Sequence, residues 1–443
     1  MPRMNQSQRF QRRNLLRTSS AGAGYSPLSF RRNFTWTFFG NVIYTACQWA
    51  MLVVLAKLGS PTIVGQFVLG TAISAPIFLL TNLHLRGAQA TDVRGEYSFN
   101  DYLGLRIAAT AIALIGVCGI VYYADYSLQT SLVVLLIAIG RGLDAISDII
   151  YGMYQSREQM EQIARPMILN GLISMFFLTL LMVMTGSVVC AVAGWTLASA
   201  LTLVYNLTTA RGYLKSPLPA NKSIANFRTF FGSRPRKLVQ LASLALPLGV
   251  TTMLGSLTAN IPRYFIEHEL GTKELGIFAA MAYILFSGTT IVSALGQAAS
   301  PRLARYYSSG NHDAFRNLLQ ELIGLGAIGG LIGFVAAAIG GQKILSLLYS
   351  PEYAHNVDTF LWLTSAASFI FVGSFLGYGL TSIRCFRPQV PLTAASALVL
   401  TAGCALLIPR YGLNGAAVAT GLAAICQMVG CGYVLYHVLD EDL

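Results

Sequence analysis

The feature that most constrains this chain is a succession of apolar runs, each about as long as a bilayer is thick. A transmembrane helix needs about 20 mostly apolar residues. Because the runs lack the polar alternation of membrane β-strands, the sequence predicts an all-α polytopic membrane protein with about 12 transmembrane helices. The twelve runs are 34–56, 62–84, 102–122, 129–153, 166–185, 187–209, 239–262, 274–297, 317–340, 357–381, 389–408 and 412–437.

Composition excludes two classes of protein. Only 11% of the 443 residues are charged, whereas a soluble globular domain is about 25% charged. A water-soluble enzyme and a disordered chain are therefore excluded. The net charge of +12 would suit a nucleic-acid partner, but the arginine-rich N-terminus lacks the aromatic side chains on which bases stack. We expect no nucleic-acid binding.

The basic residues instead indicate orientation. Assigned to alternate sides, the loops and termini carry 23 Lys and Arg residues on one side and 5 on the other. One missed helix would invert every later loop and destroy this asymmetry. By the positive-inside rule, both termini are expected in the cytoplasm.

A basic central segment divides the twelve runs six and six. The segment 1–33 is expected to be a disordered cytoplasmic tail that touches anionic membrane lipids. The other expected segments are an N-terminal six-helix half (34–210), a basic cytoplasmic linker (211–238), a C-terminal six-helix half (239–437) and a short cytoplasmic C-terminus (438–443).

Two short motifs recur at equivalent places in the two halves. Gly65-Gln66-Phe67 begins the second run, and Gly276-Ile277-Phe278 begins the eighth. The pattern YGxxxxR closes the fourth run at Tyr151 to Arg157 and the tenth at Tyr378 to Arg384. Since the motifs come in the same order, we interpret the halves as a duplication. Two such halves with a cleft between them suit transport by alternating access.

Three stretches carry a family resemblance. They are LAKLGSPTIVGQFVLGTAISAPIFLLTNLHLRGAQATD (Leu55 to Asp92), ARPMILNG (Ala164 to Gly171) and NIPRYFIEHELGTKELGIFAA (Asn260 to Ala280). They resemble bacterial oligosaccharide flippases of polysaccharide biosynthesis, in the multidrug/oligosaccharidyl-lipid/polysaccharide exporter superfamily. The resemblance extends from about 34 to 437 and leaves out the basic tail.

The resemblance implies a substrate and a location. Such a protein flips an undecaprenyl-diphosphate-linked oligosaccharide from the cytoplasmic to the periplasmic leaflet of the bacterial inner membrane. The product serves surface polysaccharide, lipopolysaccharide or exopolysaccharide biosynthesis, where other assembly proteins are candidate partners. No cofactor is expected, although coupling to protons or Na⁺ stays open.

Two other functions remain alternatives. A cation-coupled drug antiporter of the same superfamily would line its cleft with acids and few basic residues. A membrane enzyme of polysaccharide assembly would need a catalytic set, and the longest outer loop, 341–356, is too short for one. No GxxxxGK[ST] motif is present for ATP hydrolysis. Glu267-His268-Glu269 falls short of HExxH because position 272 is Thr, so neither an enzyme nor a metal site is expected.

The fourth run carries the strongest candidate site. Ionisable groups at membrane depth are costly, so they are candidates for function. At 100° per residue, five polar positions fall within about 80° of one another. These are Arg141, Asp144, Asp148, Tyr151 and Gln155.

Two interpretations of this stripe stay open. In the functional one, Arg141 holds a diphosphate or an acidic sugar, and Asp148 is a candidate for ion coupling. In the structural one, Arg141 and Asp144 neutralise each other, and Asp148 caps a neighbouring helix.

Further polar residues are weaker candidates. Thr37, Asn41, Thr45 and Gln48 share one face of the first run, which either lines the cleft or bonds a neighbouring helix. Arg106 either reaches headgroups by snorkelling or holds substrate phosphate. Arg157 and Arg384 flank the cytoplasmic mouth, where they either attract the anionic headgroup or serve orientation alone.

Overall fold

In the described part of the chain, every regular element is an α-helix. The structure is a computed structural model that describes residues 30–92, 96–157, 159–215, 235–383, 385 and 387–441. Its helices are α2 (Phe30–Leu58), α3 (Pro61–Asn82), α4 (Leu85–Thr91), α5 (Phe99–Tyr123), α6 (Leu128–Gln155), α7 (Glu161–Thr185), α8 (Val188–Lys215), α9 (Pro235–Leu270), α10 (Thr272–Ser308), α11 (His312–Leu348), α12 (Pro351–Ala354), α13 (Val357–Ser382) and α14 (Gln389–Glu441).

The expected membrane architecture is confirmed. Ten helical ranges in the described residues are long and apolar enough to cross a membrane. One of them, α14, contains a non-helical residue at Gly412 (φ 58°, ψ −135°), so it comprises two spans. Helix α6 is not among the ten, but its 28 residues are long enough to span a bilayer. The described helices therefore supply the twelve spans.

Capping side chains fix where several helices begin. The Ser60 hydroxyl accepts from the Ile63 N–H at 3.4 Å, ahead of Pro61 in the first turn of α3. Ser98 and Asp101 form a reciprocal capping box at the start of α5. Such caps satisfy N–H groups that have no partner within the helix. The apolar runs thus become helices with defined ends.

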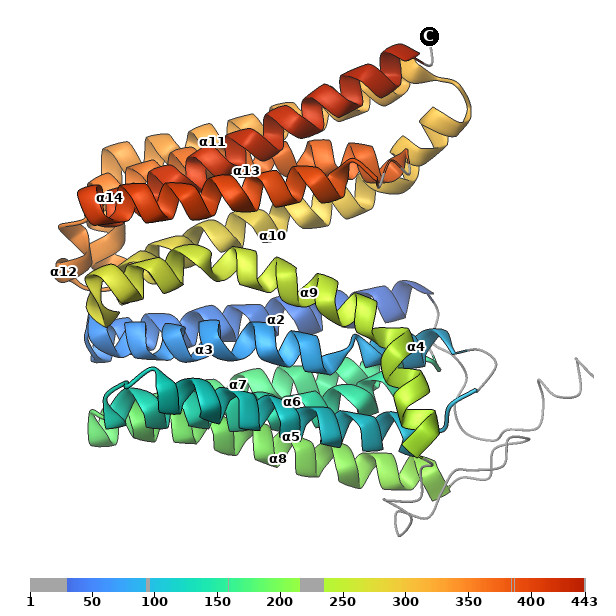
Figure 1. Cartoon of the computed structure of the whole chain (residues 1–443), viewed down its shortest axis with the longest axis vertical. Coiled ribbons are helices and arrows are strands. Elements are labelled where there is room, and N and C mark those ends of the chain that lie inside the picture. Colours follow the sequence, from blue (N-terminus) through green and yellow to red (C-terminus); the bar gives the residue numbers. More distant parts are fainter. Residues whose placement is uncertain are drawn as a thin grey trace, which may run out of the picture.

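The helices form two groups that α9 joins. Helices α2 to α8 lie together on one side, and α10 to α14 lie on the other (Figure 1). Helix α9, the first helix of the C-terminal half in the sequence, runs between the groups and packs against α3 of the first and α14 of the second. The largest apolar core contains residues of both groups, among them Phe67 and Phe278. The two-half plan expected from the sequence is therefore present.

The halves meet tightly where α3 and α10 begin. A Cβ built on Gly65 would overlap the Thr272 carbonyl, and one on Gly276 would overlap the Pro61 carbonyl. Only glycine lets two helix backbones approach this closely. Gly65 and Gly276 are the repeated glycines of the sequence, so the duplicated motif packs against its own copy. We call Pro61, Gly65, Thr272 and Gly276 the glycine seal, and this the seal end.

Toward the opposite end, which carries the C-terminus, the halves diverge (Figure 1). Helix α2 is buried at Met51 and Leu52 near the seal, yet exposed at Asn41 further along. Helix α10 changes in the same way, from buried Met281 to exposed Gln297. Exposed polar side chains on both facing helices indicate a cleft that opens at this end, here called the open end.

Candidate functional site

The site begins with Arg141, the fourteenth residue of the 28-residue α6. Its charge is close enough to interact with Asp144 on the same helix and Tyr44 on α2. It also interacts with Tyr283 on α10 and Arg263 on α9. Its Nε is buried and has no hydrogen-bond partner within the described part of the chain. Arg141 thus lies about midway along α6, where the two halves face each other, and its Nε–H is free to donate a hydrogen bond to a ligand.

Arg263 is the second cation at this junction, and its expected position was wrong. The sequence indicates an outer loop after Pro262, but the structure places Arg263 inside α9, seven residues before its end at Leu270. Prolines are tolerated in membrane helices, so Pro262 does not end this one. The Arg263 Nη1 donates to Asn260 Oδ1 at 2.8 Å, and the guanidinium carbon lies 6.0 Å from the Tyr283 ring centroid.

Asp144 is held by neutral partners. Asn170 Nδ2 donates to Asp144 Oδ1 at 3.3 Å, and Ser174 donates in turn to the Asn170 Oδ1 at 3.0 Å. Arg141 and Asp144 form no direct ion pair in the described residues. Their charges still act on each other at longer range, so both interpretations of this pair stay open. We define Arg141, Arg263 and Tyr283 as the arginine junction, which has two cations beside one carboxylate.

Asp148 belongs to a different cluster, one full turn further along α6. Its Oδ1 lies 3.3 Å from Arg86 Nη1, and its Oδ2 lies 3.2 Å from Arg106 Nη2. Arg106 also donates to Asn82 Oδ1 and is 0% exposed. The snorkelling interpretation of Arg106 is wrong, because this guanidinium turns inward to a carboxylate. In the described residues the Arg106 guanidinium faces Asn82 and Asp148, and the hydrogen bonds given for the Asp148 carboxylate come from Arg86 and Arg106.

Arg86 was counted from the sequence only as a loop charge. It lies on the short helix α4, which follows two left-handed residues, Leu83 (φ 51°) and His84 (φ 50°). Its Nε donates to Gln155 Oε1 at 2.8 Å, and its guanidinium carbon lies 5.7 Å from the Tyr151 ring centroid. The inner part of the polar stripe therefore binds an arginine of the same half.

Removing the charge of Asp148 should destabilise the N-terminal half. In Asp148→Asn the buried Arg106 guanidinium loses its carboxylate partner, and breaking a buried ion pair costs roughly 3 kcal/mol. We expect a lower midpoint of thermal unfolding in detergent. The double variant Asp148→Asn/Arg106→Gln should recover much of that loss. Equal unfolding midpoints for wild type and Asp148→Asn would contradict this role.

The weaker candidates form none of the contacts that define the two clusters. Asn41 is exposed toward the open end, and its Nδ2 donates to the Thr37 carbonyl of its own helix at 2.8 Å. Gln48 is half-buried and bonds the Tyr44 hydroxyl. Arg157 is half-buried in the turn after α6. Arg384 lies outside the described residues. No group of three or more His, Cys, Asp or Glu suited to a metal ion occurs in the described residues.

The chain matches two family profiles and a curated relative. A profile described as polysaccharide biosynthesis protein matches residues 30–307. A second, described as MatE, matches residues 247–406. The relative is the capsular polysaccharide biosynthesis protein CapF of Staphylococcus aureus, 26% identical over 404 residues, which are 91% of this chain and 98% of that protein.

Solved structures share the fold. An inward-facing multidrug resistance MATE family transporter of the MOP superfamily superposes with a TM-score of 0.70 at 13% identity, covering 90% of this chain and 95% of that one. The lipid II flippase MurJ in an inward closed conformation gives a TM-score of 0.66 at 13% identity, covering 91% and 87%. Both superpositions extend over the two halves.

Proposed function

Because this chain belongs to the polysaccharide biosynthesis protein family and is a multi-pass membrane transporter of MOP-superfamily fold, we propose that it flips a lipid-linked oligosaccharide. The carrier we propose is undecaprenyl diphosphate, and the movement runs from the cytoplasmic to the periplasmic leaflet of the bacterial inner membrane. The open end then faces the cytoplasm, together with both termini, and the seal end faces the periplasm. Other polysaccharide assembly proteins are candidate partners.

The arginine junction is the observation that carries this proposal. Arg141 and Arg263 come from opposite halves, and Arg141 has a buried Nε with no partner. Arginine stays charged and makes forked hydrogen bonds to phosphate. A charged residue inside a membrane protein is costly unless a function requires it. Two arginines and one carboxylate leave a net positive charge at this site, and a diphosphate headgroup would neutralise it.

The same geometry suggests how a transport cycle proceeds. The headgroup enters from the open end and reaches the arginine junction, while the glycine seal blocks the far side. Because Arg141 and Arg263 lie on different halves, an anion between them favours an arrangement in which the halves close around it. Opening of the glycine seal then exposes the headgroup to the other side.

We assign Asp148 a positioning role in this cycle. Its carboxylate is shared by Arg86 and Arg106, and so it fixes the helices that carry them. Coupling to protons or Na⁺ through Asp148 would require these two guanidiniums to release it. The exposed Asn41 lies along the entry route of the glycan, and Gln48 lies near the junction beside Tyr44.

Deletion of the gene in its host tests the proposed function. We expect undecaprenyl-diphosphate-linked oligosaccharide to accumulate on the cytoplasmic face, and leaflet-specific labelling of the glycan measures this. Wild-type protein supplied from a plasmid should relieve the accumulation. If the glycan lipid crosses normally in the deletion strain while sensitivity to cationic drugs rises, the flippase is refuted in favour of an antiporter.

A further inference from the structure

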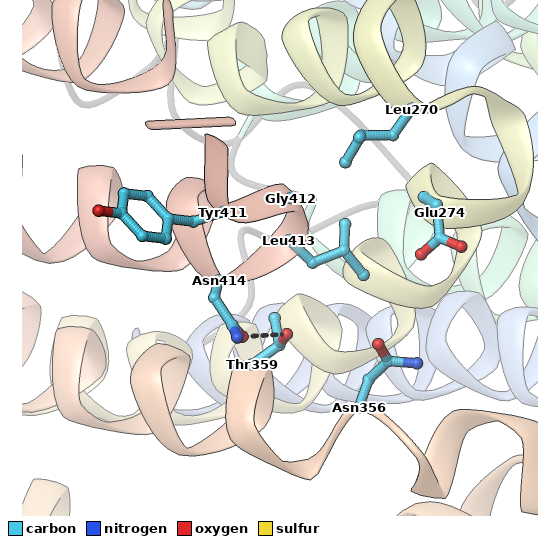
Figure 2. A pocket seen from close by; sticks show the side chains of 8 residues that line it. All are labelled: Leu270, Glu274, Asn356, Thr359, Tyr411, Gly412, Leu413 and Asn414. Carbon is cyan, nitrogen blue, oxygen red and sulfur yellow. Dashed lines mark hydrogen bonds between the residues drawn. The ribbon is translucent and has the colours of Figure 1, made fainter. Parts of the chain in front are cut away.

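A polar pocket lies at the seal end of the C-terminal half, apart from the arginine junction. Its volume is about 330 Å³. Figure 2 shows side chains from α9, α10, α13 and α14, together with the residue that precedes α13, around a common space. A carboxylate, two amides, an aliphatic hydroxyl and two leucines belong to Glu274, Asn356, Asn414, Thr359, Leu270 and Leu413. Tyr411 and Gly412 complete the lining.

The pocket has a fixed wall and free polar groups. Thr359, which is 3% exposed, donates from Oγ1 to Asn414 Oδ1 at 2.6 Å (Figure 2). This bond orients the amide and leaves its Nδ2 available. Within the described residues, no hydrogen bond is formed by that Nδ2, by the Asn356 side chain or by the Glu274 carboxylate. These three side chains are half-buried, and their free atoms are open to solvent, so they can bond a ligand that enters the pocket.

The carboxylate of Glu274 has no direct ion pair in the described residues. The adjacent Lys273 forms its direct ion pair with Glu352 of α12, at 2.6 Å, and interacts with Glu274 only at longer range. No lysine or arginine lines the pocket. A phosphate or another anion is therefore disfavoured as the ligand.

The duplicated half shows that the fold does not require these polar groups. When Gly65 is aligned with Gly276, Glu274 corresponds to Ile63. The left-handed glycines Gly186 (φ 62°) and Gly412 (φ 58°) mark equivalent turns, so Asn414 corresponds to Val188. Both corresponding residues are apolar. The carboxylate and the Asn414 amide of the pocket therefore have no polar counterpart at the corresponding positions of the N-terminal half.

These observations together define the chemistry of the ligand. Amides both donate and accept, and a carboxylate accepts from hydroxyls, while Leu270 and Leu413 offer an apolar surface. A volume of about 330 Å³ is at the small end of ligand pockets. A divalent metal ion is coordinated by six or more oxygen atoms. The pocket offers one carboxylate and a few neutral oxygen atoms, which are better suited to bind hydroxyl groups. We propose that this pocket binds one neutral sugar ring of a glycan at the seal-end face.

The role of this site in transport rests on the proposed function, whereas the binding of a sugar to the pocket does not. If the seal end faces the periplasm, the sugar belongs to the glycan that the protein has just delivered there. The site would then hold the glycan on the outer face after the diphosphate leaves the arginine junction. Binding of a free sugar depends only on the pocket.

Saturation-transfer NMR with the full-length protein in sugar-free lipid nanodiscs tests this proposal. The probes are the methyl β-glycosides of glucose, galactose and N-acetylglucosamine, with that of glucuronic acid as the charged comparison. Glu274→Ile and Asn414→Val install the residues that the other half carries. Gln342→Val, at an exposed position on α11, is the matched control.

We expect transfer to at least one neutral glycoside and less to the charged one. Each pocket variant should weaken that binding about tenfold, as expected for a lost hydrogen bond to a charged or buried group, while Gln342→Val keeps it. No transfer to any neutral glycoside, or unchanged binding in both pocket variants, overturns the proposal. The proposal is also overturned if NaCl stabilises the wild-type protein and Glu274→Ile is the only variant that loses this stabilisation, because that result would indicate a cation site. Arg141→Gln should lose transport but keep sugar binding, which separates this inference from the proposed function.

Discussion

Replacing Arg141 by glutamine should reduce flipping by about 10- to 100-fold, as expected for the loss of a forked, charge-assisted contact to phosphate. The change removes one of the two cations of the arginine junction and leaves Arg263 as its only cation. Arg141→Lys keeps the charge but loses the fork, so it should fall between wild type and Arg141→Gln. The measurement is the initial rate at which undecaprenyl-diphosphate-linked oligosaccharide reaches the outer leaflet of membrane vesicles.

Arg302→Gln is the matched control for this prediction. Arg302 is exposed near the open end of α10, so its loss removes the same charge from the chain without touching the junction. We expect wild-type flipping for Arg302→Gln and unchanged folding for all three variants. Equal rates for Arg141→Gln and Arg302→Gln would show that the junction does not hold the substrate.

Gly276→Leu at the glycine seal should abolish transport and shift the protein away from the conformation described here. Even a single Cβ added at this position would overlap the Pro61 carbonyl. The overlapping atom belongs to the backbone, which cannot move aside as a flexible side chain can. The seal ends of the two halves must therefore separate. A transporter that cannot close one side cannot alternate between sides, whatever its affinity for the substrate.

Spin labels on Lys57 and Gln342 measure this change. Both residues are exposed near the seal end, one on each half, and the seven native cysteines are first replaced by alanine. Gly276→Leu should lengthen the distance between the labels, whereas Gly333→Leu should leave it unchanged because nothing lies within 4 Å of a Cβ at Gly333. An unaltered distance distribution in Gly276→Leu would refute the seal.

Apolar runs were sufficient to predict the spans because the bilayer imposes one length and one polarity on every helix. The run 129–153, for example, became α6 (Leu128–Gln155). Even the non-helical residue of α14, Gly412, coincides with the first residue of the second of the two runs assigned to that helix. The repeated glycines were also visible in the sequence, but their direct contact depends on how two copies of a motif face each other.

The partners of the polar stripe could not be predicted from the sequence. Helical periodicity places Arg141 and Asp148 on one face of α6, but it does not say which helices meet that face. Asp148 turned out to bind Arg86 and Arg106 of its own half, whereas Arg141 faces Arg263 of the other. Arg263 was assigned to a loop because an apolar run was ended at a proline that the membrane helix in fact contains.

The most direct test of the account is flipping by the purified protein alone. Proteoliposomes would contain undecaprenyl-diphosphate-linked oligosaccharide from the host, and a membrane-impermeant enzyme that trims the glycan would report the fraction on the outer face over time. The account predicts rapid, complete exposure of the glycan with wild-type protein, and slow exposure with Arg141→Gln or empty liposomes. Wild-type protein that leaves the glycan lipid where it started, yet moves a cationic dye against a proton gradient, would contradict it.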